Sequence, residues 1–297
     1  MKSYKDIAGD GGSNIVAQVG EQVGRLNARM ASVRHVVAVM SGKGGVGKSS
    51  LTVNLASALA LQGAEVGILD ADINGSSIPK MTGLRGRSPE RGPSGMIPPK
   101  NSLNTRVMSI DLLLTDDRSP VQWKAPTQDD AYTWRAMMEM GAVREFISDT
   151  DWGTLDFLFI DLPPGTDKLP NLAGLLPHLS GAIIVTIPSG VSEFVVGKSI
   201  RLAGELNTPI VGLVENMSSY VCTHCGQEEA LFPGGNIERM AGEEGIPYLG
   251  SIPFDPRIAA AADDGLLFMT RFGDTAAGEA IRGVAAEMQG FLDGGTE

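Results

Sequence analysis

Short, mainly apolar runs alternate with stretches of helical periodicity along most of the chain. Apolar runs of this length predict strands that are buried on both faces of a sheet. They occupy residues 35–40, 65–72, 105–114, 155–165, 181–188, 209–217 and, as an edge strand, 245–253. Helical spacing of apolar residues predicts helices at 14–30, 49–61, 193–206 and 274–292. The alternation predicts an α/β fold, with a doubly wound, mostly parallel sheet and right-handed crossovers.

The same pattern divides the chain into three parts. We expect residues 1–32 to form an N-terminal extension with a peripheral helix, because apolar residues recur there with helical spacing. Residues 33–270 hold the strands and form the main domain, and residues 271–297 form a closing helix and tail. Residues 85–135 are the least regular stretch, rich in Pro, Gly and Asp, and we expect surface excursions or a partner face there.

Composition narrows the class of protein further. Of the 297 residues, 42% are hydrophobic and 5% aromatic, so aliphatic side chains build the core. The formal net charge of −11 argues against general binding to nucleic acid or to an acidic membrane, since either needs a basic surface. The two cysteines cannot form a disulfide framework, and no apolar run suits a secretion signal or a spanning helix. We therefore expect a cytoplasmic protein without a nucleic-acid or membrane partner.

A glycine-rich loop lies between the first predicted strand and the helix that follows it. The sequence from Gly42 to Ser49 satisfies G-x-x-x-x-G-K-S/T, the phosphate loop (P-loop) of nucleotide-binding proteins. Its backbone N–H groups curl around phosphate oxygens, and the helix N-terminus adds positive potential. Lys48 is expected to reach the β- and γ-phosphates, and the Ser49 hydroxyl to ligate Mg²⁺. The residues of this loop expected to bind ATP are Gly42, Lys43, Gly44, Gly45, Val46, Gly47, Lys48, Ser49 and Ser50.

Lys43 is a second lysine in this loop, five residues upstream of Lys48. The form KGGVGKS resembles the deviant phosphate loop of the MinD/ParA/nitrogenase iron protein group of dimeric P-loop ATPases. The resemblance implies that Lys43 crosses the interface of a homodimer and touches the partner's nucleotide. A second cation there would stabilise the charge that develops during phosphoryl transfer, as an arginine finger does. Lys43 and Lys48 are therefore the expected catalytic lysines of an ATPase.

Three aspartates lie at the ends of predicted strands. Asp70 and Asp72 close the strand at 65–72, and Asp161 closes the run FLFID. The carboxyl ends of parallel strands form the edge at which nucleotides bind in such sheets. A carboxylate in this position suits Mg²⁺, and Asp161 is expected to hold the ion through water. In the resembled group, Asp70 lies near the Mg²⁺ shell and Asp72 orients the attacking water, which makes Asp72 the third expected catalytic residue.

Two later segments are expected to bind the nucleotide base. Asn216 lies in VENM, at the end of the strand at 209–217, and its amide offers both a donor and an acceptor. The resemblance implies that Asn216 hydrogen-bonds adenine. Pro253, in the segment GSIPFDP, is expected to pack against the base.

Cys222 and Cys225 form a CxxC motif shortly after Asn216, on a predicted loop. Two thiolates at this spacing suit one metal centre, but a tetrahedral site needs four ligands. Two subunits related by a twofold axis would supply them. The spacing alone leaves three interpretations open: a bridging 4Fe–4S cluster, a bridging zinc ion, or a redox dithiol.

The position of the CxxC motif makes the resemblance more specific. Segments between about residues 33 and 265, among them VAVMSGKGGVGKSSLTVNLASALA and PIVGLVENMSSYVCTHCG, are similar to the Mrp/ApbC iron–sulfur cluster carriers. That family implies a 4Fe–4S cluster shared by Cys222 and Cys225 of a homodimer, its transfer to apo iron–sulfur proteins, and slow ATP hydrolysis. The chain departs from the family pattern on switch and partner-facing segments, at Asn74, at Ser76 and within residues 134–138 and 188–199.

Two other functions fit parts of the sequence. A MinD/ParA-like positioning or regulatory ATPase, with zinc on the CxxC motif, would need a membrane-binding C-terminal helix or a basic DNA surface. The acidic tail MQGFLDGGTE and the negative net charge favour neither. An electron donor like the nitrogenase iron protein would carry its cluster cysteines well apart in the sequence, whereas these form one motif.

Overall fold

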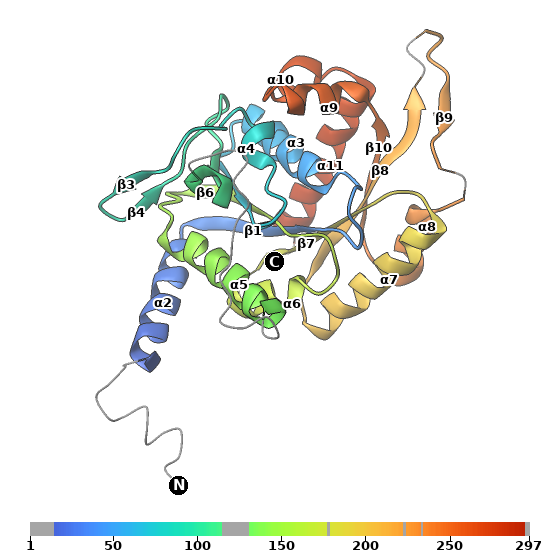
Figure 1. Cartoon of the computed structure of the whole chain (residues 1–297). Coiled ribbons are helices and arrows are strands. Elements are labelled where there is room, and N and C mark those ends of the chain that lie inside the picture. The colour runs from blue at the N-terminus through green and yellow to red at the C-terminus, as the bar shows by residue number, and fades with distance from the viewer. Residues whose placement is uncertain (1–14, 115–130, 177–178, 222–223, 233, 295–297) are drawn as a thin grey trace.

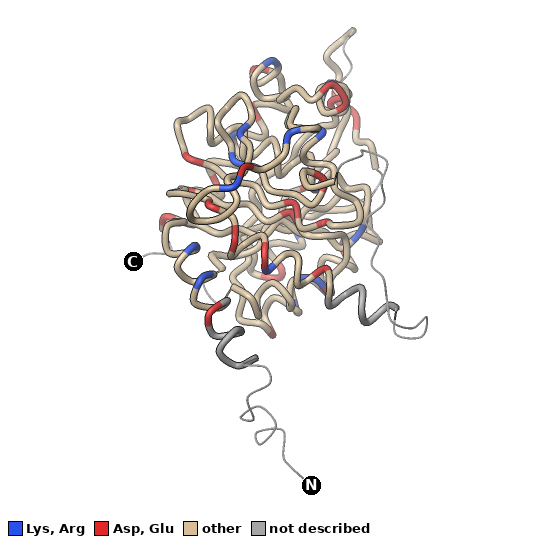
Figure 2. Tube along the Cα trace, turned by 60° about the vertical axis from the view of Figure 1, so that its left-hand side comes forward, with Lys and Arg blue, Asp and Glu red and all other residues tan. Residues whose placement is uncertain are grey.

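The computed structural model describes residues 15–114, 131–176, 179–221, 224–232 and 234–294. Figure 1 shows a central sheet with helices on both of its faces, the α/β arrangement that the alternation of strands and helices predicts. None of the described helices combines the length and the apolar character needed to cross a bilayer. Figure 2 shows acidic and basic positions interspersed along the described trace in that view, so the net charge is spread out.

One sheet runs through the molecule, and all of its strands except β9 are parallel. The order is β10-β8-β7-β1-β6-β2-β5, and β9 pairs antiparallel with β8. The strands are β1 (Val33–Met40), β2 (Val66–Asp70), β5 (Arg106–Met108), β6 (Leu155–Asp161), β7 (Gly181–Thr186), β8 (Ile210–Val221), β9 (Glu228–Ala230) and β10 (Tyr248–Phe254). β10 lies at the edge, as predicted, and β1 lies between β6 and β7. The carboxyl ends of β1, β6 and β2 therefore meet at one edge of the sheet.

Helices cover the two faces of the sheet and enclose a separate hydrophobic core on each. The first face carries α3 (Lys48–Leu61), α4 (Ile78–Met81), α9 (Pro256–Asp263), α10 (Phe268–Phe272) and α11 (Ala276–Gly294). The second face carries α2 (Ile15–Met30), α5 (Ala131–Asp149), α6 (Leu169–Leu175), α7 (Gly190–Glu205) and α8 (Ile237–Glu244). Figure 1 shows the same division, with α3 and α11 on one side and α5 and α7 on the other.

The pattern of β1 explains why its sequence is apolar without alternation. Val37 and Val39 belong to the core beneath α3 and α11, whereas Val36 and Ala38 belong to the core beneath α5 and α7. A central parallel strand is buried on both faces, so both sets of side chains must be apolar. α3, which follows β1 directly, is also enclosed: ten of its 14 residues are buried. The loop between β1 and α3 is thus anchored by two buried elements.

The prediction of a strand over residues 105–114 is wrong in its second half. β5 ends at Met108, and a 3₁₀ helix spans Ile110–Leu113. The Ser109 hydroxyl oxygen caps this turn, accepting a hydrogen bond from the Asp111 N–H at 3.3 Å. A short apolar run does not distinguish a strand from a helical turn, and the capping serine decides between them. The irregular stretch 85–135 also contains a small two-stranded sheet, β3 (Glu90–Gly92) with β4 (Gly95–Ile97), while residues 115–130 lie outside the described residues.

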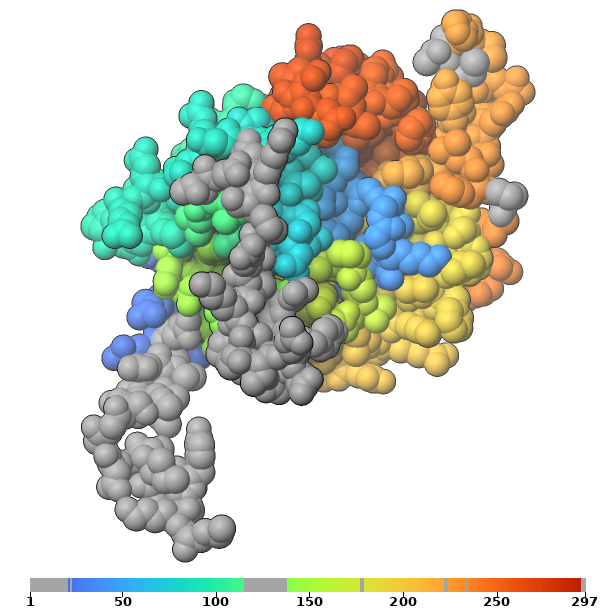
Figure 3. All heavy atoms as spheres, in the orientation of Figure 1, coloured from blue at the N-terminus to red at the C-terminus, as the bar shows by residue number. Residues whose placement is uncertain are grey.

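β8 is longer than predicted and carries a hairpin away from the body. The predicted strand ended at residue 217, but β8 continues to Val221 and pairs there with β9, with Tyr220 opposite Glu229. In Figures 1 and 3 this hairpin projects beyond the rest of the molecule. Every described residue from His224 to Leu231 is exposed. The hairpin therefore presents its turn to a partner or to solvent.

Candidate functional site

The phosphate loop has the backbone geometry that its glycines predict. Gly45 and Gly47 have positive φ angles of 80° and 84°, which glycine adopts without strain. Gly47 is the N-cap of α3, and its carbonyl accepts the Leu51 N–H at 2.9 Å. A Cβ atom at Gly47 would lie 2.2 Å from Nδ2 of Asn216. Close approach of a second strand therefore requires glycine at this position as much as the backbone angle does.

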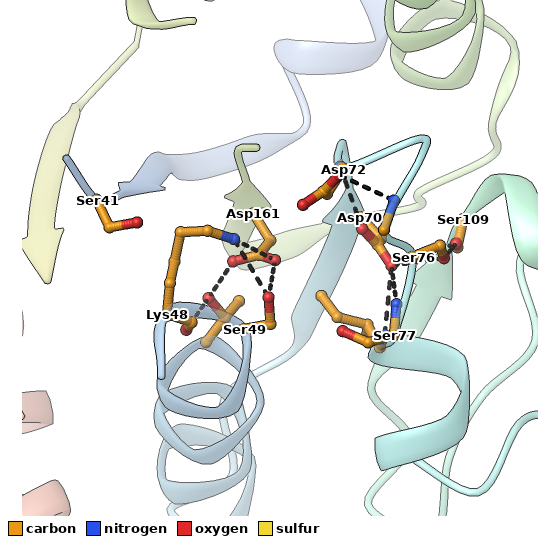
Figure 4. A network of polar contacts seen from close by, with 12 residues as sticks. Ser41, Lys48, Ser49, Asp70, Asp72, Ser76, Ser77, Ser109 and Asp161 are labelled. Atoms are coloured by element: carbon orange, nitrogen blue, oxygen red, sulfur yellow. Dashed lines mark hydrogen bonds and ion pairs between the residues drawn. The ribbon is translucent and has the colours of Figure 1, made fainter. Parts of the chain in front are cut away.

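Lys48 and Ser49 both point at Asp161, at the end of β6 (Figure 4). The Lys48 ammonium lies 2.8 Å from Oδ2 of Asp161, and the Ser49 hydroxyl donates to the same oxygen at 2.6 Å. Lys48 also donates to the Ser49 Oγ at 3.2 Å. Lys48 is 6% exposed and Asp161 is fully buried, so each charge is compensated mainly by the other. The structure thus brings together the three residues predicted to bind phosphate and Mg²⁺.

Asp70 lies beside this cluster, because β2 pairs with β6 and places Asp70 opposite Asp161. The Oδ2 atom of Asp70 accepts hydrogen bonds from the Ser76 hydroxyl at 2.8 Å and from the Ser77 N–H at 3.2 Å. Burial, together with the nearby Asp161 charge, raises the pKa of Asp70 to about 7. The loop after β2 is therefore folded around the Asp70 side chain, as Figure 4 shows.

Asp72 lies in that loop and is half-buried, whereas Asp70 is fully buried. Its Oδ1 atom accepts the Gly75 N–H at 3.0 Å, which closes a tight turn. The next residues hold the turn from both sides: Asn74 donates its amide to Glu139 of α5 at 2.6 Å, and Ser76 bonds Asp70. Asn74 and Ser76 are two of the departures from the family pattern, and both make polar contacts that fix the loop carrying Asp72.

The oxygen donors at this edge of the sheet fit Mg²⁺. The Ser49 hydroxyl and the Asp161 carboxylate lie within hydrogen-bond distance of each other, with Asp70 on the adjacent strand. Hydroxyl and carboxylate oxygens, completed by water and phosphate, are the ligands that Mg²⁺ prefers. Ser49 and Asp161 are the residues that would hold the ion, and Asp70 would lie behind them, already engaged by the loop.

A pocket of about 270 Å³ opens beside the phosphate loop. Its walls include Gly47 and Ser50 of the loop together with Asn216 and Pro253, the two residues assigned to the base. The Asn216 amide donates to the Val46 carbonyl at 2.8 Å, so β8 is tied directly to the phosphate loop. The pocket is mainly apolar and contains a few polar groups, which suits a flat heterocyclic base.

Lys43 lies on the opposite flank of the loop from this pocket. Its side chain is half-buried, and with Gly42 it lines a small cleft against Ser192 and Val195 of α7. Among the described residues the Lys43 ammonium has no hydrogen-bond or ion-pair partner, in contrast to Lys48. A Cβ at Gly42 would lie 2.1 Å from the Val195 side chain, so α7 packs tightly on the start of the loop.

Cys225 is exposed in the turn that joins β8 to β9, and it is a free thiol. Cys222 lies outside the described residues. No group of three or more His, Cys, Asp or Glu side chains is placed to hold a metal ion within the described part of the chain. The predicted loop is thus part of the hairpin formed by β8 and β9.

Sequence reasoning missed three hydroxyl residues of this site. Ser76 and Ser109 both reach Asp70, and Thr52 donates to Asp161 at 2.9 Å from within α3. A signal for Thr52 was present, because it follows Lys48 by four residues and so lies on the same face of the helix. No comparable signal exists for Ser109, because only the pairing of β5 with β2 brings it to Asp70.

Parallel strands around a central β1, a phosphate loop after it, and acidic residues at the ends of β2 and β6 define a P-loop NTPase. The sequence matches the family described as "ParA: NUBPL iron-transfer P-loop NTPase" over residues 32–130 and 125–289. The chain belongs to this family.

Relatives of known name agree with the family assignment. The "Iron-sulfur cluster carrier protein" of Methanocaldococcus jannaschii is 44% identical over 249 residues, which cover 84% of this chain and 82% of that protein. The "Cytosolic Fe-S cluster assembly factor NUBP2" of Bos taurus is 38% identical over 87% of this chain and 93% of its own length.

Solved structures place the fold in the same group. A nucleotide-binding protein from Archaeoglobus fulgidus, in complex with ADP, superposes with a TM-score of 0.71 and 35% identity, covering 82% of this chain and 92% of that one. The MinD cell division protein of Aquifex aeolicus has a TM-score of 0.59 at 21% identity, over 86% of this chain and 97% of its own, which shows a shared fold alone.

Proposed function

We propose that this protein is an ATP-hydrolysing carrier of iron–sulfur clusters that works as a homodimer. Its cargo would be a 4Fe–4S cluster held by Cys222 and Cys225 of both protomers and passed to apo iron–sulfur proteins. The observation that carries the proposal is the continuity of β8. The strand contacts the phosphate loop through Asn216 and runs on to Val221, next to the first cysteine.

That continuity gives the nucleotide a mechanical route to the thiols. Val221 follows Asn216 by five residues, a span of at most roughly 17 Å at the rise of a β-strand. β8 runs from Asn216 to the turn that holds Cys225 as one strand, with an irregularity after Asn216 where Met217 has a φ of 55°, so a shift at Asn216 passes to the turn along the backbone. Beyond this irregularity, both β10 and β9 pair with Tyr220, which fixes the far end of the strand.

The ligand count supports a shared cargo. Four thiolates complete the ligation of a 4Fe–4S cluster, and the whole chain contains two cysteines. An exposed turn at the end of a projecting hairpin allows two copies to meet about a twofold axis. The relatives named as iron–sulfur cluster carriers and assembly factor favour iron over zinc as the metal.

The residues around Asp161 support ATP chemistry. Lys48 and Ser49, now engaged with Asp161, are placed to turn to the phosphates and to Mg²⁺, which would supply charge neutralisation at the γ-phosphate. Asp72 would orient the attacking water from its tight turn. The Lys43 ammonium, which has no hydrogen-bond or ion-pair partner among the described residues, would reach the nucleotide of the second protomer.

Anaerobic reconstitution with ferrous iron and sulfide tests the cargo. We expect a brown protein with a broad visible absorption band and about four iron and four sulfide ions per dimer. Cys225→Ala should remove the band, because it takes two of the four thiolates from the dimer. His224→Ala is the matched control, since His224 is exposed in the same turn, and it should bind the cluster as the native protein does.

The carrier function itself is tested by transfer. The loaded protein is mixed with an apo iron–sulfur enzyme, and recovery of the enzyme's activity is followed with and without Mg·ATP. Recovery that depends on Cys225 supports a carrier. A protein that binds zinc tightly and incorporates no iron would instead support the regulatory ATPase, and electron transfer to the acceptor without loss of iron would indicate a donor.

A further inference from the structure

We infer that Thr52 is a positioning residue that fixes the carboxylate of Asp161 for metal binding. The inference rests on the proposed ATP function, and it concerns a residue outside the phosphate-loop motif. Thr52 lies in α3, one turn after Lys48, and its side chain is fully buried. It reaches Asp161 across 109 residues of sequence.

The two oxygens of Asp161 have separate partners. The Thr52 hydroxyl lies 2.9 Å from Oδ1, while Lys48 and Ser49 both engage Oδ2, at 2.8 and 2.6 Å. Thr52 therefore holds the oxygen on the far side from the phosphate loop. Rotation of the carboxylate about its Cβ–Cγ bond would break this contact, so the contact defines the orientation of Oδ2.

The direction of the hydrogen bond follows from the groups involved. The Thr52 Oγ1 also lies 3.0 Å from the Lys48 carbonyl, one turn back in the helix. The hydroxyl has one proton, and both the carbonyl and an ionised carboxylate are acceptors only. A bond to a charged acceptor is about twice as strong as a neutral one, which favours Asp161 as the recipient.

Other buried hydroxyls show what a purely local role looks like. Ser57 of α3 donates only to Val53 O at 2.7 Å, and Thr82 donates to Ile78 O at 2.8 Å and, more weakly, to Pro79 O. Their acceptors are backbone carbonyls three or four residues back. Thr52 has such a carbonyl too, but it adds a contact with a strand of the central sheet, at the residue assigned to Mg²⁺.

The contact matters most when nucleotide binds. Lys48 and Ser49 would then leave Oδ2 for the phosphates and Mg²⁺, and Thr52 would remain as the fixed partner of Asp161. Without the Thr52 hydroxyl the carboxylate is free to rotate, and Mg²⁺ affinity falls while nucleotide binding without Mg²⁺ is retained. Outer partners of metal ligands typically contribute about 10- to 100-fold in metal affinity.

The test is a Mg²⁺ titration of the protein bound to a fluorescent ATP analogue, read by fluorescence rather than by turnover. Thr52→Val should weaken Mg²⁺ binding by about tenfold or more, and Thr52→Ser, which keeps the hydroxyl, should restore it. Thr82→Val is the matched control: it removes a buried threonine hydroxyl that bonds only to nearby carbonyls, and it should leave Mg²⁺ affinity unchanged. Thr52→Ala provides the same test if the valine variant does not fold, which circular dichroism will reveal.

Distinct results separate this inference from the proposed function. Mg²⁺ affinity of Thr52→Val and Thr52→Ala equal to that of the native protein would overturn the positioning role and leave the ATP function standing. Equal losses in Thr52→Val and Thr52→Ser would also overturn it, because the hydroxyl would not be the group that matters. A native protein that binds no Mg·nucleotide would overturn the proposed ATP function and this inference together.

Discussion

The two lysines of the phosphate loop differ in how they are held. Lys48 is buried in an ion pair with Asp161, whereas Lys43 is half-buried at the opposite flank of the loop. Removing Lys48 outright would leave a buried carboxylate without its partner, at a cost of about 3–5 kcal/mol. Glutamine at position 48 keeps a hydrogen-bond donor beside Asp161, so it is the better variant for separating function from folding.

Mixed dimers test whether Lys43 acts on the partner's nucleotide. Lys43→Ala and Lys48→Gln should each lack ATPase activity when pure. Mixed in equal amounts with exchange of subunits, they should recover roughly a quarter of native activity, because half of the dimers would contain one complete site. That site combines Lys48 of one protomer with Lys43 of the other.

The measurement is ATP turnover of the mixture against each pure variant. If Lys43 acts within its own chain, no mixed dimer contains a complete site, and the mixture stays inactive. Subunit exchange is checked separately, by the co-purification of untagged Lys43→Ala chains with affinity-tagged Lys48→Gln chains.

At the scale of elements, the sequence predicted the strands that bear the site and missed details that depend on pairing. The runs ending at Asp70 and Asp161 belong to central strands that are buried on both faces of the sheet. Such strands need apolar side chains on both faces, and this made them recognisable in the sequence. β9, with the sequence EEA, has no such signature. It is a strand only because β8 extends past the sheet and offers it a partner.

The start of α9 shows how one aspartate stabilises an element. Asp255 is the N-cap residue: its Oδ1 accepts the Arg257 N–H at 2.9 Å, and the Arg257 side chain bonds both carboxylate oxygens. Burial alone would raise the pKa of Asp255, but the hydrogen bonds from Arg257 outweigh it and lower the pKa below its ordinary value of 3.8.

Replacing Asp255 should therefore have an effect that depends on pH. A carboxyl group whose pKa is lowered in the folded state stabilises the fold at pH values above its unfolded-state pKa. This stabilisation is lost as the pH falls through the folded-state pKa. Asp255→Ala should reduce the free energy of unfolding by about 1–2 kcal/mol at neutral pH, and the difference from native should shrink below about pH 4.

Urea denaturation at a series of pH values measures this difference. Asn236→Ala is the matched control, because Asn236 caps α8 with an uncharged side chain that accepts the Arg239 N–H at 2.7 Å. The Asn236→Ala variant should lose a similar amount of unfolding free energy, and this loss should not depend on pH. A constant difference for Asp255→Ala across the acid range would contradict the charge-based account.

For the whole molecule, the sequence predicted which residues lie near the phosphate loop, because Asp70 and Asp161 end recognisable strands and the loop itself has a recognisable motif. The structure brings Lys48, Ser49, Asp161 and Asp70 together as expected, and Asn216 and Pro253 to one pocket. Contacts between segments far apart in the chain, such as Asn216 of β8 with Val46 of the phosphate loop, could not be read from one sequence. They depend on strand order and on the length of β8.

The proposed coupling between the nucleotide and the thiols would be a property of the whole molecule. In reduced, cluster-free protein, Mg·ATP should slow the alkylation of Cys225 by iodoacetamide several-fold, because closure of the dimer brings the two hairpin turns together. The rate is followed by peptide mass spectrometry. In the Asn216→Ala variant, the rate at which iodoacetamide alkylates Cys225 should no longer respond to ATP, even at ATP concentrations that saturate the variant.

An alkylation rate that is the same with and without ATP in the native protein would contradict coupling through β8. A rate that still responds in Asn216→Ala would assign the coupling to another route.

The cysteine hairpin contributes no side chain from His224 to Leu231 to either hydrophobic core. Mutations there leave the free energy of folding nearly unchanged, so they do not push the protein toward its stability threshold. The sequence of this hairpin can therefore change while the rest of the fold stays the same. In a fold built in this way, the exposed hairpin can acquire new binding properties without loss of stability in the rest of the molecule.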